Sequence, residues 1–248
     1  MTNPQPPLYT TTGELFQLVR VYYQVFNQAT VLGVFKKLRC VEFDGTQNRW
    51  VWLFEHEARK LRLGKPHSQL PKKIRPVVIG SFTFRSDNQM LLDLRSVERA
   101  TQAIEFFDKR INRRAAKVTN LRIVNKLFEV TQENTRQLIQ QSPDTFFDVD
   151  NVVRPAETLM AGIEQLQQEE NLGIRRKEAL AWIEQQAQAP LAEVEEMSAN
   201  FYEDGIEPLE VSLKLRQLEL LERWKGNRDA NMLNIIQKLM KPDPRFFP

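Results

Sequence analysis

Short β-rich runs separated by turn signals fill much of the first half of this chain, and they restrict its fold more than any other feature. Val, Ile, Phe and Trp, which favour strands, dominate "NRWVWLFE", "VVIGSFTF" and "AKVTNLRIV". Asp44-Gly45 supplies a positive φ at a turn, so we predict a hairpin formed by "GVFKKLRCVEFD" and "NRWVWLFE". A second strand pair is predicted for "VVIGSFTF" and "QMLLDL", and a last strand for "AKVTNLRIV".

Helical patterns flank these runs. Thr11 and Glu14 have the spacing of a capping box, and an apolar pattern of helical spacing follows, which predicts a helix over 12–28. Ser96 is predicted to cap a second helix, whose apolar stripe is Val97, Ala100, Ile104, Phe107 and Ile111. We predict a loop at 63–76 and a third helix at about 129–141. The resulting order predicts an α+β fold with an antiparallel or mixed sheet and helices on one side.

The second part of the chain is predicted to be helical throughout. Pro155, Pro190 and Pro208 stand where a first helical turn tolerates proline, and Gly205 and Gly226 stand where helices end. Short connections make neighbouring helices antiparallel, which predicts an all-α C-terminal helical bundle. We therefore divide the chain into a basic α+β domain, 1–135, and an acidic helical domain, 136–248.

Charge divides the chain in the same way. Residues 1–135 contain 22 Lys and Arg and 12 Asp and Glu, a net charge of +10, whereas residues 136–248 contain 13 and 20, a net charge of −7. Such an asymmetry bears on partners and association rates rather than on fold. The first part is expected to attract acidic protein surfaces or nucleic acid.

Targeting and redox signals are sparse. The sequence has no apolar run of the roughly 20 residues that a membrane span needs, and its start lacks the basic and apolar regions of a signal peptide. Its single cysteine, Cys40, cannot form an internal disulfide bond. We expect a cytoplasmic protein, or one in a reducing organelle interior.

Catalytic and cofactor motifs are missing from the sequence. The nine glycines are scattered and form neither G-x-G-x-x-G nor a P-loop. One cysteine and two histidines are too few for a zinc site, so His56 is interpreted as an exposed side chain, His67 as a loop residue and Cys40 as a small buried one. No catalytic, cofactor-binding or metal site is predicted, and the sequence leans against an enzyme.

Four basic segments of the first part are the predicted partner-binding residues, because Lys and Arg on one face attract phosphates and carboxylates. They are Lys36, Lys37, Arg39, Arg59, Lys60, Arg62, Lys72, Lys73, Arg75, Lys109, Arg110, Arg113, Arg114 and Lys117. Trp50, Trp52 and Phe54 alternate along one strand and share one face. They form either a platform on which bases stack or, as we favour, a core facing the helix stripe.

These observations favour a non-catalytic adaptor or assembly factor that binds an acidic surface through its basic domain and a second partner through its helical domain. The alternative is an RNA-binding protein that uses the same basic face, and the third hypothesis is an enzyme acting on a phosphorylated or nucleic-acid substrate. Phe246-Phe247 is either a further contact or a pair that folds back onto the bundle.

Overall fold

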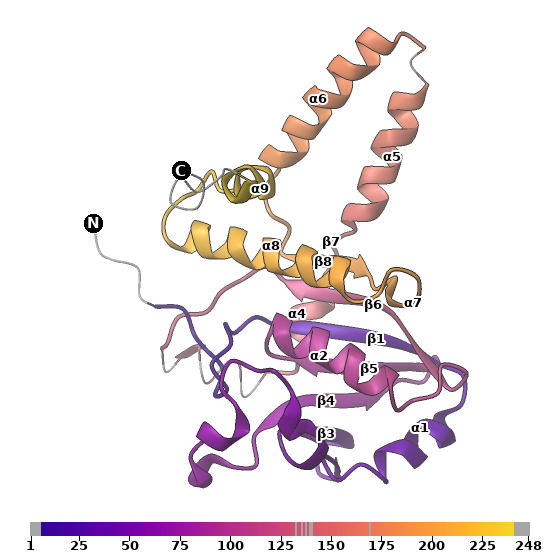
Figure 1. Ribbon diagram of the computed structural model, residues 1–248, viewed down its shortest axis with the longest axis vertical. Helices are drawn as coiled ribbons and strands as arrows, with labels where there is room; N and C mark the ends of the chain where they lie inside the picture. Colours follow the sequence, from indigo (N-terminus) through magenta and orange to yellow (C-terminus); the bar gives the residue numbers. More distant parts are fainter. Residues whose placement is uncertain are drawn as a thin grey trace, which may run out of the picture.

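An eight-stranded mixed sheet is the centre of the fold in the computed structural model, which describes residues 6–131, 133, 134, 136, 138, 141–168 and 170–240 (Figure 1). Its strand order is β2-β3-β4-β5-β1-β6-β8-β7, and all neighbours are antiparallel except the parallel pair β7 and β8. The strands are β1 (Val19–Val25), β2 (Val41–Asp44), β3 (Arg49–Leu53), β4 (Val78–Phe84), β5 (Gln89–Leu94), β6 (Ala116–Val124), β7 (Val152–Val153) and β8 (Val194–Ser198). The predicted α+β class with a mixed sheet is confirmed.

Two long helices pack side by side along one face of this sheet, α2 (Val97–Asp108) and α8 (Glu207–Trp224) (Figure 1). A hairpin formed by two further helices, α5 and α6, projects away from the β7 end of the sheet (Figure 1). The other helices and 3₁₀ turns are α1 (Gln28–Phe35), α4 (Asp144–Phe147), α5 (Pro155–Gln167), α6 (Leu172–Gln188), α7 (Phe201–Asp204), α9 (Met232–Met240), η1 (His56–Lys60), η2 (His67–Gln69) and η3 (Lys72–Ile74). No helix in the described part of the chain combines the length and apolarity needed to cross a membrane.

The main core lies between the sheet and α2. Ser96 caps α2 as predicted, because its hydroxyl accepts a hydrogen bond from the Arg99 amide at 3.1 Å, and the predicted apolar stripe is buried. The Phe107 ring lies at the centre of an aromatic cluster, 4.8 Å from Phe82 and 5.0 Å from Trp52 between ring centroids. Trp52 and Phe54 are buried in this core, which confirms the favoured interpretation of that row.

The predicted helix over 12–28 is wrong. Residues 19–25 form β1, in which Val19, Val21 and Tyr23 face the core and the residues between them face the other side of the sheet. Apolar residues at this spacing fit both the helical and the strand period over a short segment, and β-branched and aromatic residues favour the strand. Glu14 caps no helix, and its carboxylate is instead buried in the loop that precedes β1.

The strand predicted to begin near residue 33 is also shorter than expected. Residues 28–35 form α1, because the Asn27 side chain accepts a hydrogen bond from the Thr30 amide at 2.9 Å and caps the first turn. Only 41–44 pair with β3. The predicted loop at 63–76 contains two short 3₁₀ turns, η2 and η3.

The second part of the chain is not helical throughout, so the prediction of an all-α bundle needs correction. The segment after Pro190 forms β8, which pairs with β6 and β7, because an open sheet edge gives its backbone groups partners. Leu209 and Leu213 of α8 join the main core. The two parts therefore contribute to one sheet and one core, and the domain boundary at residue 135 stays a prediction.

Several helix ends in this part lie where the prolines and glycines predict them. α5 begins at Pro155, and Gly226 follows α8 with a positive φ of 96°. Between 133 and 138 the described residues are helical, in line with the predicted third helix. Phe246-Phe247 lies outside the described residues.

Candidate functional site

A row of polar side chains crosses the face of the sheet opposite α2. Pairing places Ser81, Asp93, Arg20, Arg122 and Glu196 directly opposite one another on β4, β5, β1, β6 and β8. Two neighbouring arginines repel each other, so this row needs the acids on either side of it.

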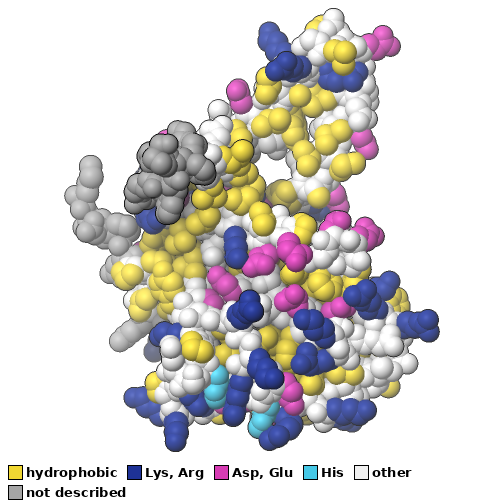
Figure 2. Space-filling model, in the orientation of Figure 1, with side chains coloured by type: hydrophobic (Ala, Val, Ile, Leu, Met, Phe, Trp, Pro, Cys, Tyr) yellow, Lys and Arg dark blue, Asp and Glu magenta, His cyan; other side chains and the backbone are white. Residues whose placement is uncertain are grey.

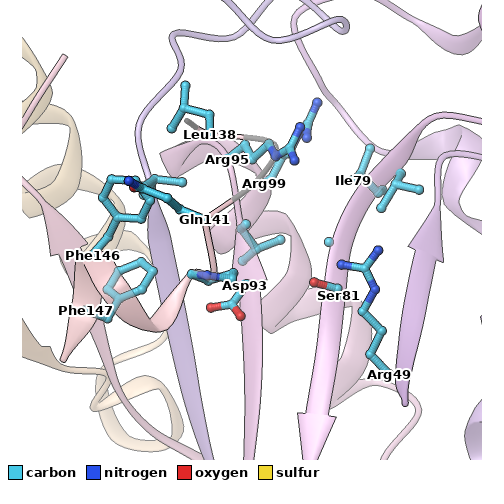
Figure 3. Close-up of a pocket in the computed structure, with 15 residues that line it drawn as sticks. Arg49, Ile79, Ser81, Asp93, Arg95, Arg99, Leu138, Gln141, Phe146 and Phe147 are labelled. Carbon is cyan, nitrogen blue, oxygen red and sulfur yellow. The ribbon is translucent and has the colours of Figure 1, made fainter. Parts of the chain in front are cut away.

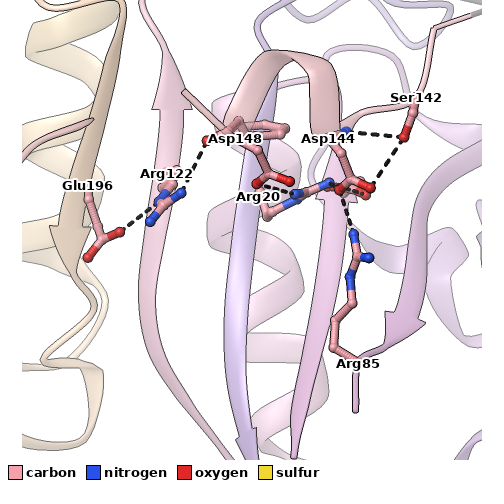
Figure 4. Close-up of polar contacts among 9 residues, drawn as sticks. Arg20, Arg85, Arg122, Ser142, Asp144, Asp148 and Glu196 are labelled. Atoms are coloured by element: carbon pink, nitrogen blue, oxygen red, sulfur yellow. Dashed lines mark hydrogen bonds and ion pairs between the residues drawn. The ribbon is translucent and has the colours of Figure 1, made fainter. Parts of the chain in front are cut away.

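Arg20 is the centre of an ion-pair network on this face (Figure 4). Its Nε lies 2.6 Å from Asp93 Oδ1, and its Nη2 lies 2.8 Å from Asp144 Oδ1 of α4. Burial alone would lower the pKa of Arg20, but the hydrogen bonds to Asp93 and Asp144 outweigh it and raise the pKa. The guanidinium therefore stays charged although it is 2% exposed.

The same network holds α4 against the sheet. Arg85 Nη2 donates a hydrogen bond to Asp144 Oδ1 at 2.6 Å, and Arg122 Nη1 donates one to the Phe147 carbonyl oxygen at 3.1 Å (Figure 4). Phe147 itself is buried beneath this segment, in a second apolar cluster with Phe16 and Val124. Ionic and apolar contacts together fix residues 142–148 over the polar face.

A cavity of about 330 Å³ lies between this segment and the beginning of β4. One wall is apolar and comes from α4 and the residues before it, whereas the opposite side carries three arginines and a serine (Figure 3). The labelled lining residues are Arg49, Ile79, Ser81, Asp93, Arg95, Arg99, Leu138, Gln141, Phe146 and Phe147.

A buried carboxylate supports one of these arginines from behind. Glu14 accepts hydrogen bonds from the Thr12 hydroxyl at 2.6 Å and the Gly64 amide at 2.9 Å, and its Oε2 lies 3.5 Å from Arg99 Nε. Burial alone would raise the pKa of Glu14, but the hydrogen bonds from Thr10 and Thr12, the charge of Arg99 and the Gly64 amide together lower it. Arg99 thus has a fixed position at the edge of the cavity.

The predicted partner-binding residues lie elsewhere, mostly around α2. Phe35 of α1 contacts Phe107, and the Arg62 amide donates a hydrogen bond to Gln102 Oε1 at 3.1 Å, so α1 and the end of η1 both flank α2. Lys and Arg side chains spread over the lower part of this face, and many of the acidic side chains in the same view form a band above them (Figure 2). The Cys40 amide donates a hydrogen bond to Glu57 Oε2 at 3.1 Å, which places the residues after α1 beside η1, whereas η3 belongs to the loop that follows.

Some of these cations are already engaged locally. Arg59 pairs with Glu55, Arg113 pairs with Asp108 at 2.9 Å, and Arg110 lies 3.6 Å from the Phe106 ring centroid and donates to its carbonyl. Arg75 donates hydrogen bonds to loop carbonyls, among them that of His67 at 2.7 Å. The others form no ion pair with any residue that the structure describes: Lys36, Lys37, Arg39, Lys60, Arg62, Lys72, Lys73, Lys109, Arg114 and Lys117.

Apolar side chains are exposed on the projecting hairpin of α5 and α6. Its two helices meet where Gly162 packs under Trp182, so closely that a Cβ at position 162 would clash with the indole ring. Large apolar side chains of both helices nevertheless remain accessible: Leu159, Met160, Ile163, Leu172, Ile174, Leu180 and Ile183. Met160 is 56% and Leu172 is 75% exposed. The sequence places these residues in a bundle, but within the described chain no third helix covers them.

The single cysteine and the two histidines differ in their burial. Cys40 is fully buried, and this burial raises the pKa of its thiol to about 12. His56 is exposed as predicted, whereas His67 is buried and its Nε2 lies 2.9 Å from Glu55 Oε1. Among the described residues, no group of three or more His, Cys, Asp or Glu is arranged to hold a metal ion.

Sequence reasoning missed the cavity arginines, because Arg49 lies far along the chain from Arg95 and Arg99. One signal was present, since Asp93 is a charged residue inside the predicted strand "QMLLDL" and marks a polar face. Comparison of the chain with protein-family models, curated proteins and solved structures finds no match.

Proposed function

We propose that this protein is a non-catalytic adaptor that binds a helix of a partner protein on its α5 and α6 hairpin and an acidic protein surface on its basic face around α2. The observation that carries this proposal is the set of exposed apolar side chains on the projecting hairpin. Such exposed apolar surface is typical of interaction sites, because its contact with water does not stabilise the fold, whereas its burial against a partner stabilises a complex.

The chemistry of the hairpin favours an amphipathic helix as its occupant. Two packed helices leave an open apolar seam, and a third helix laid along it completes a three-helix bundle. Residues 155–188 contain six acidic and three basic residues, a net charge of −3, which favours a partner helix with a basic outer face. The same charge opposes docking on an anionic lipid surface.

The basic face supports the second contact of the adaptor. Lys and Arg side chains spread over the lower part of the face shown in Figure 2, and they attract acidic groups over about 8 Å at physiological salt. Exposed cations of this kind raise association rates more than affinity, so the hairpin supplies most of the binding energy.

A synthetic peptide tests the hairpin contact. We expect an amphipathic helix of about 18 residues, with Leu on one face and Lys on the other, to bind the wild-type protein in a fluorescence anisotropy titration. The triple variant Leu159→Gln, Met160→Gln and Leu180→Gln should weaken this binding at least about tenfold, because each lost apolar contact is worth about 1.5–3 kcal/mol when fully buried.

The matched control replaces polar residues of the same hairpin, Gln165→Ser and Gln185→Ser, and should retain the wild-type affinity. Equal affinity of the apolar triple variant would remove the hairpin site. A concentration-dependent dimer that this variant abolishes would identify a second copy as the occupant, and binding of the wild type to anionic vesicles would identify a membrane; each result contradicts the proposed partner helix.

The RNA-binding alternative is tested on the basic face. At about 0.15 M salt we expect only weak binding of mixed-length RNA, because the net charge of −7 in residues 136–248 opposes wrapping by a polyanion. Filter binding across a salt series measures it. Tight binding that falls steeply with salt, and is lost in the variant Lys36→Gln, Lys109→Gln and Arg114→Gln, would replace the adaptor proposal with the RNA-binding one.

A further inference from the structure

Three arginines converge on the cavity beside β4, and this excess of positive charge is separate from the hairpin and from the basic face around α2. Arg49, Arg95 and Arg99 line the cavity together with a single acid, Asp93. Both Asp93 oxygens already accept hydrogen bonds from Arg20, at 2.6 and 3.2 Å, so this carboxylate does not neutralise the cavity arginines. Figure 3 shows the Arg49 guanidinium beside Ser81, and the Arg95 and Arg99 side chains together at another edge of the cavity.

The partners of the three arginines are unequal. Arg49 Nε lies 3.2 Å from Asp44, and Arg99 Nε lies 3.5 Å from Glu14 without making a hydrogen bond. Arg95 has no ion-pair or hydrogen-bond partner for its side chain among the residues that the structure describes. Arg95 is exposed to solvent and has no countercharge among the described residues, so an anion can bind its guanidinium without displacing a protein partner.

The charges of the three arginines influence one another. Partial burial of the Arg95 side chain lowers its pKa, and the positive charge of Arg49 lowers this pKa further. Burial likewise lowers the pKa of Arg99, to about 10, where Arg95 adds to the lowering and Glu14 opposes it. The positive charge of Arg95 is therefore disfavoured by Arg49, and that of Arg99 by Arg95.

We propose that this cavity is a binding site for a small organic phosphate whose phosphoryl group lies between Arg49, Arg95 and Arg99 and whose apolar body lies against Phe146 and Leu138. A phosphoryl group offers three oxygens to three separate guanidinium groups and to the Ser81 hydroxyl, whereas a carboxylate is satisfied by one arginine. Leu138, Phe146 and Phe147 give the cavity an apolar wall, which fits a planar or aliphatic group. A volume of about 330 Å³ accommodates a ligand of this size rather than a polymer.

Phenyl phosphate is the probe that combines both parts of the expected ligand, and isothermal titration calorimetry measures its affinity. We expect a Kd of about 1 mM or below for phenyl phosphate, weaker binding of inorganic phosphate and of benzoate, and no measurable binding of phenol. Arg95→Gln should weaken phenyl phosphate binding at least about tenfold, because it removes charge-assisted hydrogen bonds.

Arg114→Gln is the matched control, because it removes one exposed, unpaired arginine that does not line the cavity. It should leave the affinity within about twofold of wild type, since general attraction over a distance is screened by salt. The Arg95 side chain is exposed, so its variant is expected to fold, and Arg49→Gln provides a second cavity variant with the same expected loss.

Absence of phenyl phosphate binding, equal weakening by Arg114→Gln, or phenol binding as tight as phenyl phosphate would each overturn the proposal. These results are independent of the hairpin titration, because neither probe nor variant involves α5 or α6.

Discussion

Phe107→Ala is expected to lower the free energy of unfolding by about 3–5 kcal/mol, the range for removing a fully buried aromatic side chain. The Phe107 ring contacts four others, with centroid distances of 4.8 Å to Phe82, 5.0 Å to Trp52 and Phe106, and 6.1 Å to Phe35. These rings come from β3, β4, α1 and α2, so the cavity left by alanine opens at the junction of sheet and helices. Unfolding in urea, followed by tryptophan fluorescence, measures the loss.

The control for this substitution is Phe26→Ala. Phe26 is 61% exposed, and its replacement should change the free energy of unfolding by about 0.5 kcal/mol or less. A loss below about 1 kcal/mol for Phe107→Ala would show that the aromatic cluster does not form the core of this fold.

Arg20→Met is expected to lower the free energy of unfolding by about 3–5 kcal/mol, because it removes one partner of a buried ion pair and leaves Asp93 without a countercharge. Asp93 and Asp144 would both lose a guanidinium that lies within 2.8 Å of them. Methionine keeps the unbranched aliphatic part of the side chain, so the lost charge rather than lost apolar packing dominates the effect. Urea unfolding at neutral pH measures it.

Arg154→Met is the control, because it removes an ion pair that is exposed rather than buried. Arg154 Nε lies 2.9 Å from Glu196 Oε1, a distance similar to those around Arg20, but its side chain is 44% exposed. We expect a loss of about 0–1 kcal/mol. Adding Asp93→Asn to Arg20→Met should recover part of the larger loss, because it removes an uncompensated acid; similar losses in Arg20→Met and Arg154→Met would contradict the buried network.

The elements predicted best from sequence are those with a local physical cause. The residues 116–124 alternate and form β6, Ser96 caps α2, and Pro155 and Gly226 mark helix ends. Each signal acts within a few residues, through side-chain direction, capping or a restricted φ. The sequence also predicted that Trp52 and Phe54 are buried. Aromatic rings that alternate along a strand share one face, and burying that face against an apolar helix stripe removes a large apolar area from water.

The elements predicted worst needed a distant partner. β1 fits two periods at once, and only pairing with β5 and β6 selects the strand. β8, "VEEMS", has residues that favour helices, and the open edge of β6 overrides that preference. Neither choice is visible within a short window of sequence.

The sequence by itself determined the α+β class, the helix-capping and strand-turn signals, and the unequal division of charge between the two parts, because composition and local pattern specify these properties. Only the tertiary structure decided that the second part of the chain extends the sheet, that large apolar side chains of the hairpin stay exposed within the described part of the chain, and that Arg49, Arg95 and Arg99 line one cavity. These three outcomes depend on which strands pair and which surfaces cover each other, and residues far apart in the chain meet only when those pairings form.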